Sequence, residues 1–136
     1  MRFHISIESD LDRLPGLPPP FSSVEKRLNA ARILREHGFR TVITVSPLLP
    51  ICGPEGFFAR LAQMADGVVI DHFIQGDGTL NGSRTLRTKL PAAMEQVNPK
   101  SIELSYRDEI VAIAKRHFPN RVGVNIDGFA GRFLST

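Results

Sequence analysis

Residues 40–73, RTVITVSPLLPICGPEGFFARLAQMADGVVIDHF, indicate the fold class, because two buried strands flank a helix in this stretch. Residues 40–46 form a β-branched run of the kind found in strands covered on both faces. Pro47 ends this run, and Pro54 opens a helix whose apolar side chains recur at helical spacing. Residues 66–73 then form a second short apolar run. The stretch therefore predicts two parallel strands joined by a crossover helix.

The residues that precede this unit add another strand and another helix. Residues 2–9 alternate apolar and polar side chains, which is the period of a strand. The proline-rich segment 10–21 predicts a loop. Residues 22–38 then predict a helix, opened by a capping box from Ser22 to Glu25.

The residues that follow continue the alternation. Residues 74–88 are rich in glycine and hydroxyl side chains and predict a loop, and residues 91–97 predict a short helix. A second capping pattern at Ser105 predicts a helix that runs to Phe118. A final strand is expected at 121–127, with a glycine-rich tail after it.

The order of these elements predicts a single α/β domain over residues 1–136, with about four parallel strands joined by right-handed crossover helices. Four such units make up about half of a (β/α)₈ barrel, which usually takes roughly 200 residues or more. We therefore expect a partial, half TIM-like barrel. Both ends look cut, because no helix precedes the first strand and none is expected after the last.

Composition excludes several classes of protein. The chain has 136 residues, 42% of them hydrophobic, which is enough for one buried core. The net charge of +3 is spread along the chain, so nucleic-acid binding is only weakly supported. Cys52 is the single cysteine, which excludes an internal disulfide framework and indicates a reducing compartment. No stretch approaches the length of a membrane span, so we predict a soluble, cytoplasmic protein with no membrane partner.

Several motifs together resemble the C-terminal half of radical S-adenosylmethionine (SAM) proteins of the spore-photoproduct-lyase-like group, which are often labelled DNA repair photolyases. They are HISIESDLDRLPG, TVSPLLPI, VVIDHFIQGDGTLNGSRT and VGVNIDGFAGRF, and the likeness covers essentially the whole chain. The resemblance implies a partial (β/α)₆ barrel. In that family a CxxxCxxC motif holds the [4Fe–4S] cluster that cleaves SAM.

The sequence departs from this family because it contains no such motif. One cysteine cannot supply three thiolates to a [4Fe–4S] cluster, so we expect this chain neither to bind the cluster nor to be active alone. No catalytic and no metal-binding residue is predicted. The resemblance implies a fragment, a subunit or a degenerate relative, with a cluster-bearing N-terminal half as one expected partner.

Three expected cofactor-binding residues belong to the first strand and helix. Ser6 and Glu8 lie at the C-terminal end of the strand, where the resemblance implies contacts to the ribose or the amino-acid end of SAM. Arg27 on the helix could reach the SAM carboxylate, because a guanidinium matches a carboxylate. The alternatives are a solvated polar edge for Ser6 and Glu8, and an ordinary exposed helix arginine for Arg27.

Three further expected SAM- or substrate-facing residues lie at later strand ends. Ser46 lies at the end of the second predicted strand, and Asp71 and His72 lie at the C-terminal end of the third, where catalytic groups of α/β proteins collect. The alternative for Ser46 is a strand-ending turn, and an isolated Asp–His pair falls short of a metal site. The loop at 76–85 offers backbone N–H groups to a phosphate, although it matches no known phosphate loop.

Two functions from different classes remain. In the first, the chain is the SAM- and substrate-facing half of a radical SAM enzyme. In the second, it is a non-enzymatic α/β binding or interaction module. Because a half barrel leaves one sheet face uncovered, we expect homo-oligomers in either case. Cys52 has no neighbouring base in the sequence and is expected to be chemically inert.

Overall fold

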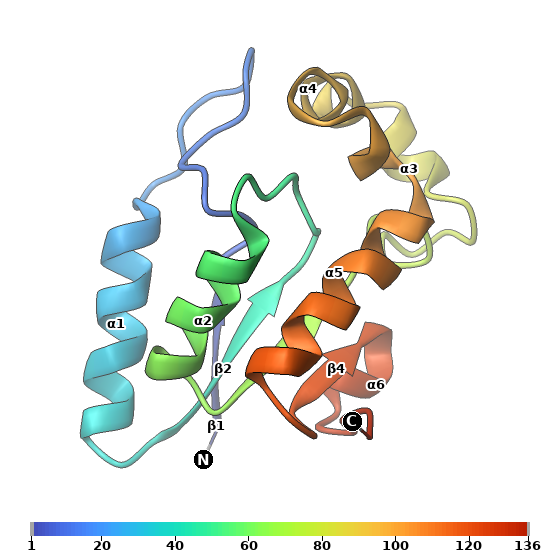
Figure 1. The fold of residues 1–136 in the computed structure, drawn as a ribbon. Helices are drawn as coiled ribbons and strands as arrows, with labels where there is room; N and C mark the ends of the chain where they lie inside the picture. The colour runs from blue at the N-terminus through green and yellow to red at the C-terminus, as the bar shows by residue number, and fades with distance from the viewer. Residues whose placement is uncertain (1, 136) are drawn as a thin grey trace.

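A computed structural model describes residues 2–135 and shows an α/β fold (Figure 1). Its sheet has four strands, all parallel, in the order β1-β2-β3-β4. They are β1 (Arg2–Ser6), β2 (Arg40–Val45), β3 (Gly67–Ile70) and β4 (Val122–Val124). The predicted α/β class with four parallel strands and crossover helices is confirmed.

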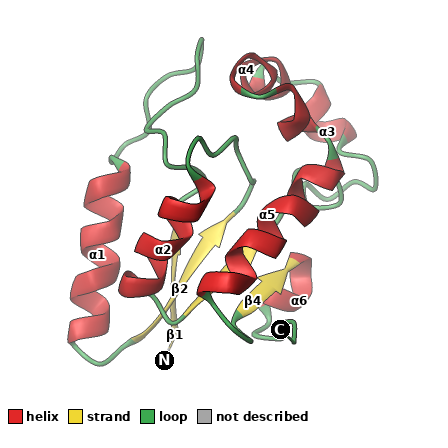
Figure 2. Ribbon diagram, in the orientation of Figure 1, coloured by secondary structure: helices red, strands yellow, loops and turns green. Residues whose placement is uncertain are grey.

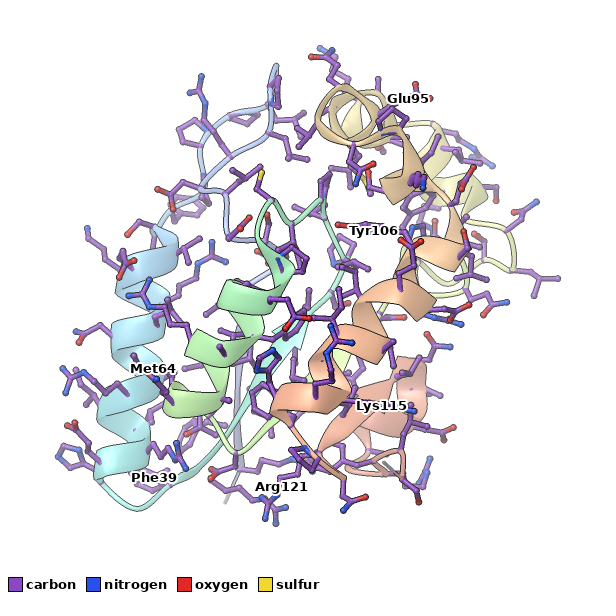
Figure 3. The ribbon with its side chains drawn as sticks, in the orientation of Figure 1. Phe39, Met64, Glu95, Tyr106, Lys115 and Arg121 are labelled. Carbon is purple, nitrogen blue, oxygen red and sulfur yellow. The ribbon has the colours of Figure 1, made fainter. Side chains whose placement is uncertain are left out.

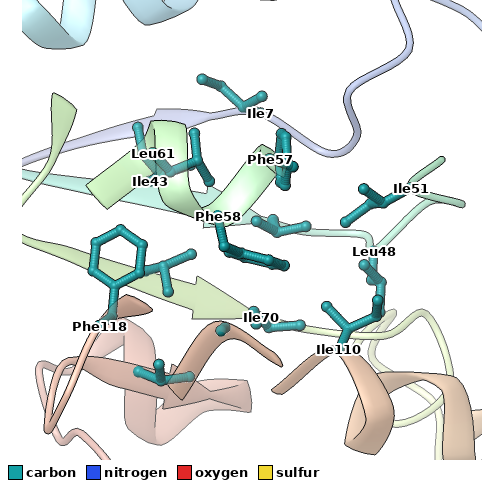
Figure 4. Close-up of a cluster of buried hydrophobic side chains, with 14 of the residues drawn as sticks. Ile7, Ile43, Leu48, Ile51, Phe57, Phe58, Leu61, Ile70, Ile110 and Phe118 are labelled. Atoms are coloured by element: carbon teal, nitrogen blue, oxygen red, sulfur yellow. The ribbon is translucent and has the colours of Figure 1, made fainter. Parts of the chain in front are cut away.

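One face of the sheet is covered by three helices, which Figure 2 shows in front of the strands. They are α1 (Val24–Glu36), α2 (Pro54–Met64) and α5 (Leu104–His117). Side chains alternate across a strand, so Ile43 and Ile70 point toward these helices. They join one apolar core, in which Phe58 and Leu61 of α2 are fully buried (Figure 4). This core holds the helices on the sheet.

The opposite face of the sheet is covered in part by the C-terminal segment. After β4 the chain turns at Asn125, where φ is 56°, into the short helix α6 (Asn125–Phe129). A Cβ atom placed on Gly128 would lie 2.7 Å from the carbonyl carbon of Gly123 and 2.9 Å from Cγ1 of Val69. The helix backbone therefore lies directly on the face that carries Val69, which is fully buried.

The tail continues across the same face. Leu134 donates its N–H to the carbonyl oxygen of Val122 at 2.7 Å and pairs antiparallel with β4. The Arg2 guanidinium at the start of β1 donates to the carbonyl oxygen of Phe129 at 3.0 Å. The prediction of a trailing tail is therefore wrong, because residues 125–135 fold back over the strands. The prediction of an uncovered sheet face is wrong only for the part that these residues cover, since His4 and Ser6 of β1 on the same face are exposed.

A second layer lies beyond the carboxyl ends of the strands. It contains α3 (Ser83–Leu86), α4 (Leu90–Val97) and the 3₁₀ helix η1 (Pro99–Ile102). Leu14 of the proline-rich loop packs in one small cluster with Phe73 and Met94. The prediction of a loop over residues 74–88 misses α3.

Two predicted helix caps are wrong by one or two residues. Ser23, rather than Ser22, caps α1 and accepts from the N–H of Lys26 at 3.2 Å. Asp12 accepts from the N–H of Val24 at 2.8 Å, so the first turn of α1 is also capped from the preceding loop. Ser105 lies inside α5, which begins after Glu103.

Within residues 2–135, no helix is both long and apolar enough to cross a membrane.

Candidate functional site

The carboxyl ends of the first three strands bring hydroxyl and carboxylate groups to one edge of the sheet. Ser6 pairs in register with Thr44, and their hydroxyl oxygens lie 3.2 Å apart. Ser46 and Asp71 directly follow the paired residues Val45 and Ile70. The Ser46 hydroxyl donates to Oδ2 of Asp71 at 3.4 Å. Parallel pairing of the strands therefore brings together residues that are 25 positions apart in the chain.

Asp71 is buried, with one carboxylate oxygen left unsatisfied. The residue is 7% exposed, and its Oδ1 has no hydrogen-bond partner among residues 2–135. Burial raises the pKa of Asp71 above the ordinary value, against the opposing effects of the Ser46 hydroxyl and the Arg107 charge. A buried carboxylate oxygen without a donor is costly, and such a group is a marker of binding sites.

The chain after β3 packs closely over Asp71. A Cβ atom placed on Gly76 would lie 2.6 Å from Oδ1 of Asp71 and 2.2 Å from the carbonyl oxygen of His72. Only glycine fits at this close approach. Farther along, the Asp77 carboxylate accepts from the backbone N–H groups of Thr79 and Thr85, which orders the loop.

Ser46 and Asp71 line a cavity of about 180 Å³, which we call the Asp71 cavity. Its other lining residues are Pro47, His72, Phe73, Gly76, Asp77 and Thr85. The cavity is therefore lined by hydroxyl groups and carboxylates together with the phenyl ring of Phe73 and the imidazole of His72. It can hold a small polar group or one end of a larger ligand, because complete ligand pockets usually measure about 300–1,000 Å³.

His72 lies beside the cavity, but both of its ring nitrogens are engaged by the backbone. The N–H of Ile74 donates to Nδ1 at 3.0 Å, which assigns the ring proton to Nε2. Nε2 lies 2.8 Å from the carbonyl oxygen of Ser101 and donates to it. The residue is fully buried, and burial lowers the pKa of His72. In this structure the ring anchors η1 to the sheet and has no free nitrogen for a ligand.

The buried His72 predicts a loss of stability in acid. Its folded-state pKa is lowered, so below about pH 6.5 the unfolded chain takes up a proton that the folded chain does not. The free energy of unfolding should then fall as the pH falls, by at most about 1.4 kcal/mol per pH unit from this group. We expect urea denaturation at pH 7.5 and 5.5 to show a smaller acid loss in His72→Gln than in the wild type. Parallel pH profiles of the two proteins would contradict this assignment.

Glu8 and Arg27 lie together in a separate hollow. The Arg27 guanidinium donates at 2.8 Å to Oε2 of Glu8 and at 2.8 Å to the carbonyl oxygen of Ser6. Both side chains line a hollow of about 160 Å³ with Leu11, Leu14 and other residues of the proline-rich loop, which we call the Glu8 hollow. Five of the six residues expected to contact SAM therefore fall into two groups, and the sixth, Ser6, lines neither hollow.

Sequence analysis missed two residues near Asp71. Arg107, in the first turns of α5, has a side chain only 15% exposed and lowers the pKa values of both Asp71 and His72 by its charge. Its Nη1 lies 3.5 Å from Oδ1 of Asn125, which follows β4 just as Asp71 follows β3. The position of Asn125 after a strand was a signal that could have been used. Arg107 carries no such signal, because only packing of α5 places it there.

Cys52 is exposed and lies before α2. Asp10 accepts from the N–H groups of Cys52 and Gly53 at 3.0 and 2.9 Å, so the Asp10 carboxylate in the proline-rich loop fixes the two residues that precede α2. Among residues 2–135, no three His, Cys, Asp or Glu side chains gather closely enough to hold a metal ion.

Comparisons with known proteins supply no relative. The chain matches no protein-family model, no curated protein and no solved structure. The resemblance to radical SAM proteins therefore stays a prediction, and the chemistry of the two hollows is the basis for a functional proposal.

Proposed function

We propose that this chain forms the SAM- and substrate-facing half of a radical SAM-type (β/α) barrel. The observation that carries the proposal is the Ser46–Asp71 pair, which lines a cavity at the carboxyl edge of consecutive parallel strands. Ligands of (β/α) barrels bind at this edge. The sequential strand order supports a barrel arc, since strands follow one another around such a barrel.

The donors and acceptors at this edge fit part of SAM. The Asp71 carboxylate lines the cavity and can accept a hydrogen bond from an ammonium or a ribose hydroxyl, and the Ser46 hydroxyl can serve as a second polar contact. The Asp71 cavity, at about 180 Å³, is too small for the whole molecule. The rest of the ligand would need surface beyond this cavity, so binding to this chain alone should be weak.

Glu8 and Arg27 are expected to act as a unit. Their ion pair is 26% and 18% exposed at the two side chains, and Nε of Arg27 is buried without a hydrogen-bond partner within residues 2–135. A ligand carboxylate could bind Arg27 only in competition with Glu8. Because Glu8 already offsets the charge of Arg27, the pair would affect the electrostatic potential around the ligand and would not supply an unpaired cation.

SAM bound to a reduced iron–sulfur cluster supplies a 5′-deoxyadenosyl radical in the family that this chain resembles. A single cysteine cannot hold that cluster, so no radical step is assigned to the residues of this chain. What these residues contribute is binding and orientation, with Asp71 and Ser46 as the polar contacts.

A titration with SAM tests the proposal. We expect ¹⁵N-labelled protein to show saturable, weak shift changes at the amides around Ser46, Asp71 and Gly76. Asp71→Asn keeps the shape of the side chain but removes its charge, and it should weaken SAM binding about tenfold, as expected when a charged hydrogen-bond acceptor is lost.

The control variant is Asp127→Asn, which removes the same charge from an exposed side chain paired with Arg132. It should leave SAM binding unchanged. Equal weakening by both variants would indicate a general effect of charge. Absence of saturable shifts in the wild-type protein would remove the basis for the SAM proposal.

Exposed apolar side chains favour a second candidate function, a non-enzymatic interaction module. Ile126 is 78% exposed, and Phe129 and Leu134 are 36% and 40% exposed, all in the segment that covers part of the second sheet face. Exposed apolar surface of this kind is found at protein–protein contacts. Self-association stays a prediction, here placed at this segment instead of at an uncovered sheet face and strand edge. A wild-type protein that fails to bind SAM would leave the interaction module as the better candidate.

A further inference from the structure

The opposite end of the sheet carries a basic hollow, at the amino ends of the strands. It measures about 460 Å³ and is lined by Arg35, Arg40, Arg121, Asp66, Gly38 and Phe39. Figure 3 shows Phe39 and Arg121 at this lower end of the molecule. We call it the arginine hollow. None of its residues belongs to the Asp71 cavity or the Glu8 hollow.

Charge in this hollow is unbalanced. Three arginines face one aspartate, which leaves a formal charge of +2. The Asp66 carboxylate is already engaged, because Oδ2 accepts from the N–H of Thr41 at 2.8 Å and Oδ1 lies 3.5 Å from Nε of Arg35. The hollow therefore carries more positive charge than its own acid can offset.

Two of the arginines are oriented by backbone carbonyls, and only one of them, Arg35, also shares an ion pair with Asp66. Arg35 donates from Nη1 to the carbonyl oxygen of Gln63 at 3.0 Å, and Arg121 donates from Nη1 to the carbonyl oxygen of Asp66 at 3.3 Å. Backbone carbonyls orient a guanidinium but do not cancel its charge. Arg40 at the start of β2 is exposed, and no ion pair or side-chain hydrogen bond of Arg40 is found within residues 2–135. Free N–H donors are therefore left to face a ligand.

The wall beside the arginines is aromatic. Phe39 is 39% exposed and packs edge-on against Phe3, with ring centroids 5.1 Å apart. The contact with Phe3 fixes the ring while part of it remains open to solvent. An organic group attached to a bound anion would thus have an apolar surface to lie on.

We propose that the arginine hollow binds the phosphate dianion of a small phosphorylated molecule. A phosphate monoester carries a charge of about −2 near neutral pH, which complements the formal charge of the hollow. Guanidinium groups match phosphate oxygens in geometry as well as in charge. This site is independent of the function proposed above, since the two sites lie at opposite ends of the strands.

Calorimetric titration at constant ionic strength tests the site, with inorganic phosphate and adenosine 5′-monophosphate as probes. Constant ionic strength is needed because salt screens exposed charges. We expect saturable binding of phosphate in the wild-type protein. Arg40→Gln and Arg121→Gln should each weaken it about tenfold, and Arg40→Gln should leave the melting temperature unchanged because Arg40 supports no other group.

Arg87→Gln is the matched control, since Arg87 is an exposed arginine after α3 near the other end of the molecule. Its binding should equal that of the wild type. Tighter binding of the nucleotide than of phosphate would identify an ester as the ligand, and equal binding would identify free phosphate; both support the site. The proposal is overturned if no probe saturates, if Arg87→Gln weakens binding equally, or if a single-stranded oligonucleotide without a terminal phosphate binds more tightly than either probe.

Discussion

Phe58→Ala is expected to lower the free energy of unfolding by about 3–5 kcal/mol, the usual cost of removing a buried phenyl ring. Phe58 is fully buried in the core between the sheet and its three covering helices. Its ring also packs edge-on against Phe57, with centroids 5.1 Å apart. Domains of this size are typically stable by about 5–15 kcal/mol, so the change removes a large share of the total. Urea denaturation followed by circular dichroism measures it.

Phe21→Ala is the matched control for this substitution. Phe21 is fully exposed, so the same change there should alter the free energy of unfolding by less than about 0.5 kcal/mol. Similar losses at both positions would contradict the assignment of the core. A loss at Phe58 below about 1 kcal/mol would mean that α2 does not pack on the sheet in solution as described.

Gly128→Val is expected to displace α6 from the sheet. The backbone of Gly128 lies so close to Gly123 and Val69 that any side chain would overlap them. Forcing added carbon atoms into a packed contact costs typically about 1–3 kcal/mol, and occasionally more. Hydrogen exchange should detect the displacement of the C-terminal segment directly. The N–H of Leu134, which donates to the carbonyl oxygen of Val122, should lose its protection from exchange.

Gly56→Ala is the control for a change at glycine. A Cβ atom at Gly56, in the first turn of α2, meets nothing within 4 Å. Alanine there should raise the free energy of unfolding by about 0.5–1 kcal/mol, since it limits the freedom of the unfolded chain. If Gly128→Val were as stable as the wild type and retained protection at Leu134, the fold-back of the C-terminal segment would be wrong.

The strands and long helices could be predicted because their signals are local. The β-branched run at 40–46 and the glycine and proline at the start of α2 each indicate an element within a few residues. A parallel sheet then follows from the alternation of strands and helices, since a crossover can hardly be made in another way. Strand ends also located Ser46 and Asp71, because parallel strands place their carboxyl ends at one edge.

The cap of α1 and the start of α2 could not be predicted fully, because part of what fixes each comes from elsewhere in the chain. Asp12 and Asp10 reach the two helices from the proline-rich loop. A capping box detects only side chains within the first turn, so it chose Ser22 where the chain uses Ser23. The same reasoning placed Ser105 outside a helix that already contains it.

The sequence by itself determined the α/β class, the order of strands and helices along the chain, and the polar residues at the strand ends. Each of these depends on the periodicity and type of neighbouring residues. Only the tertiary structure decided how those residues are shared among sites. The ion pair closes Arg27 onto Glu8, whereas hydrogen bonds to two backbone groups withdraw the ring of His72 from any ligand. Likewise, Arg40 and Arg121 are 81 positions apart and line the same hollow only because β2 and β4 begin at the same end of the sheet. Long-range packing makes these contacts, and no local pattern carries information about them.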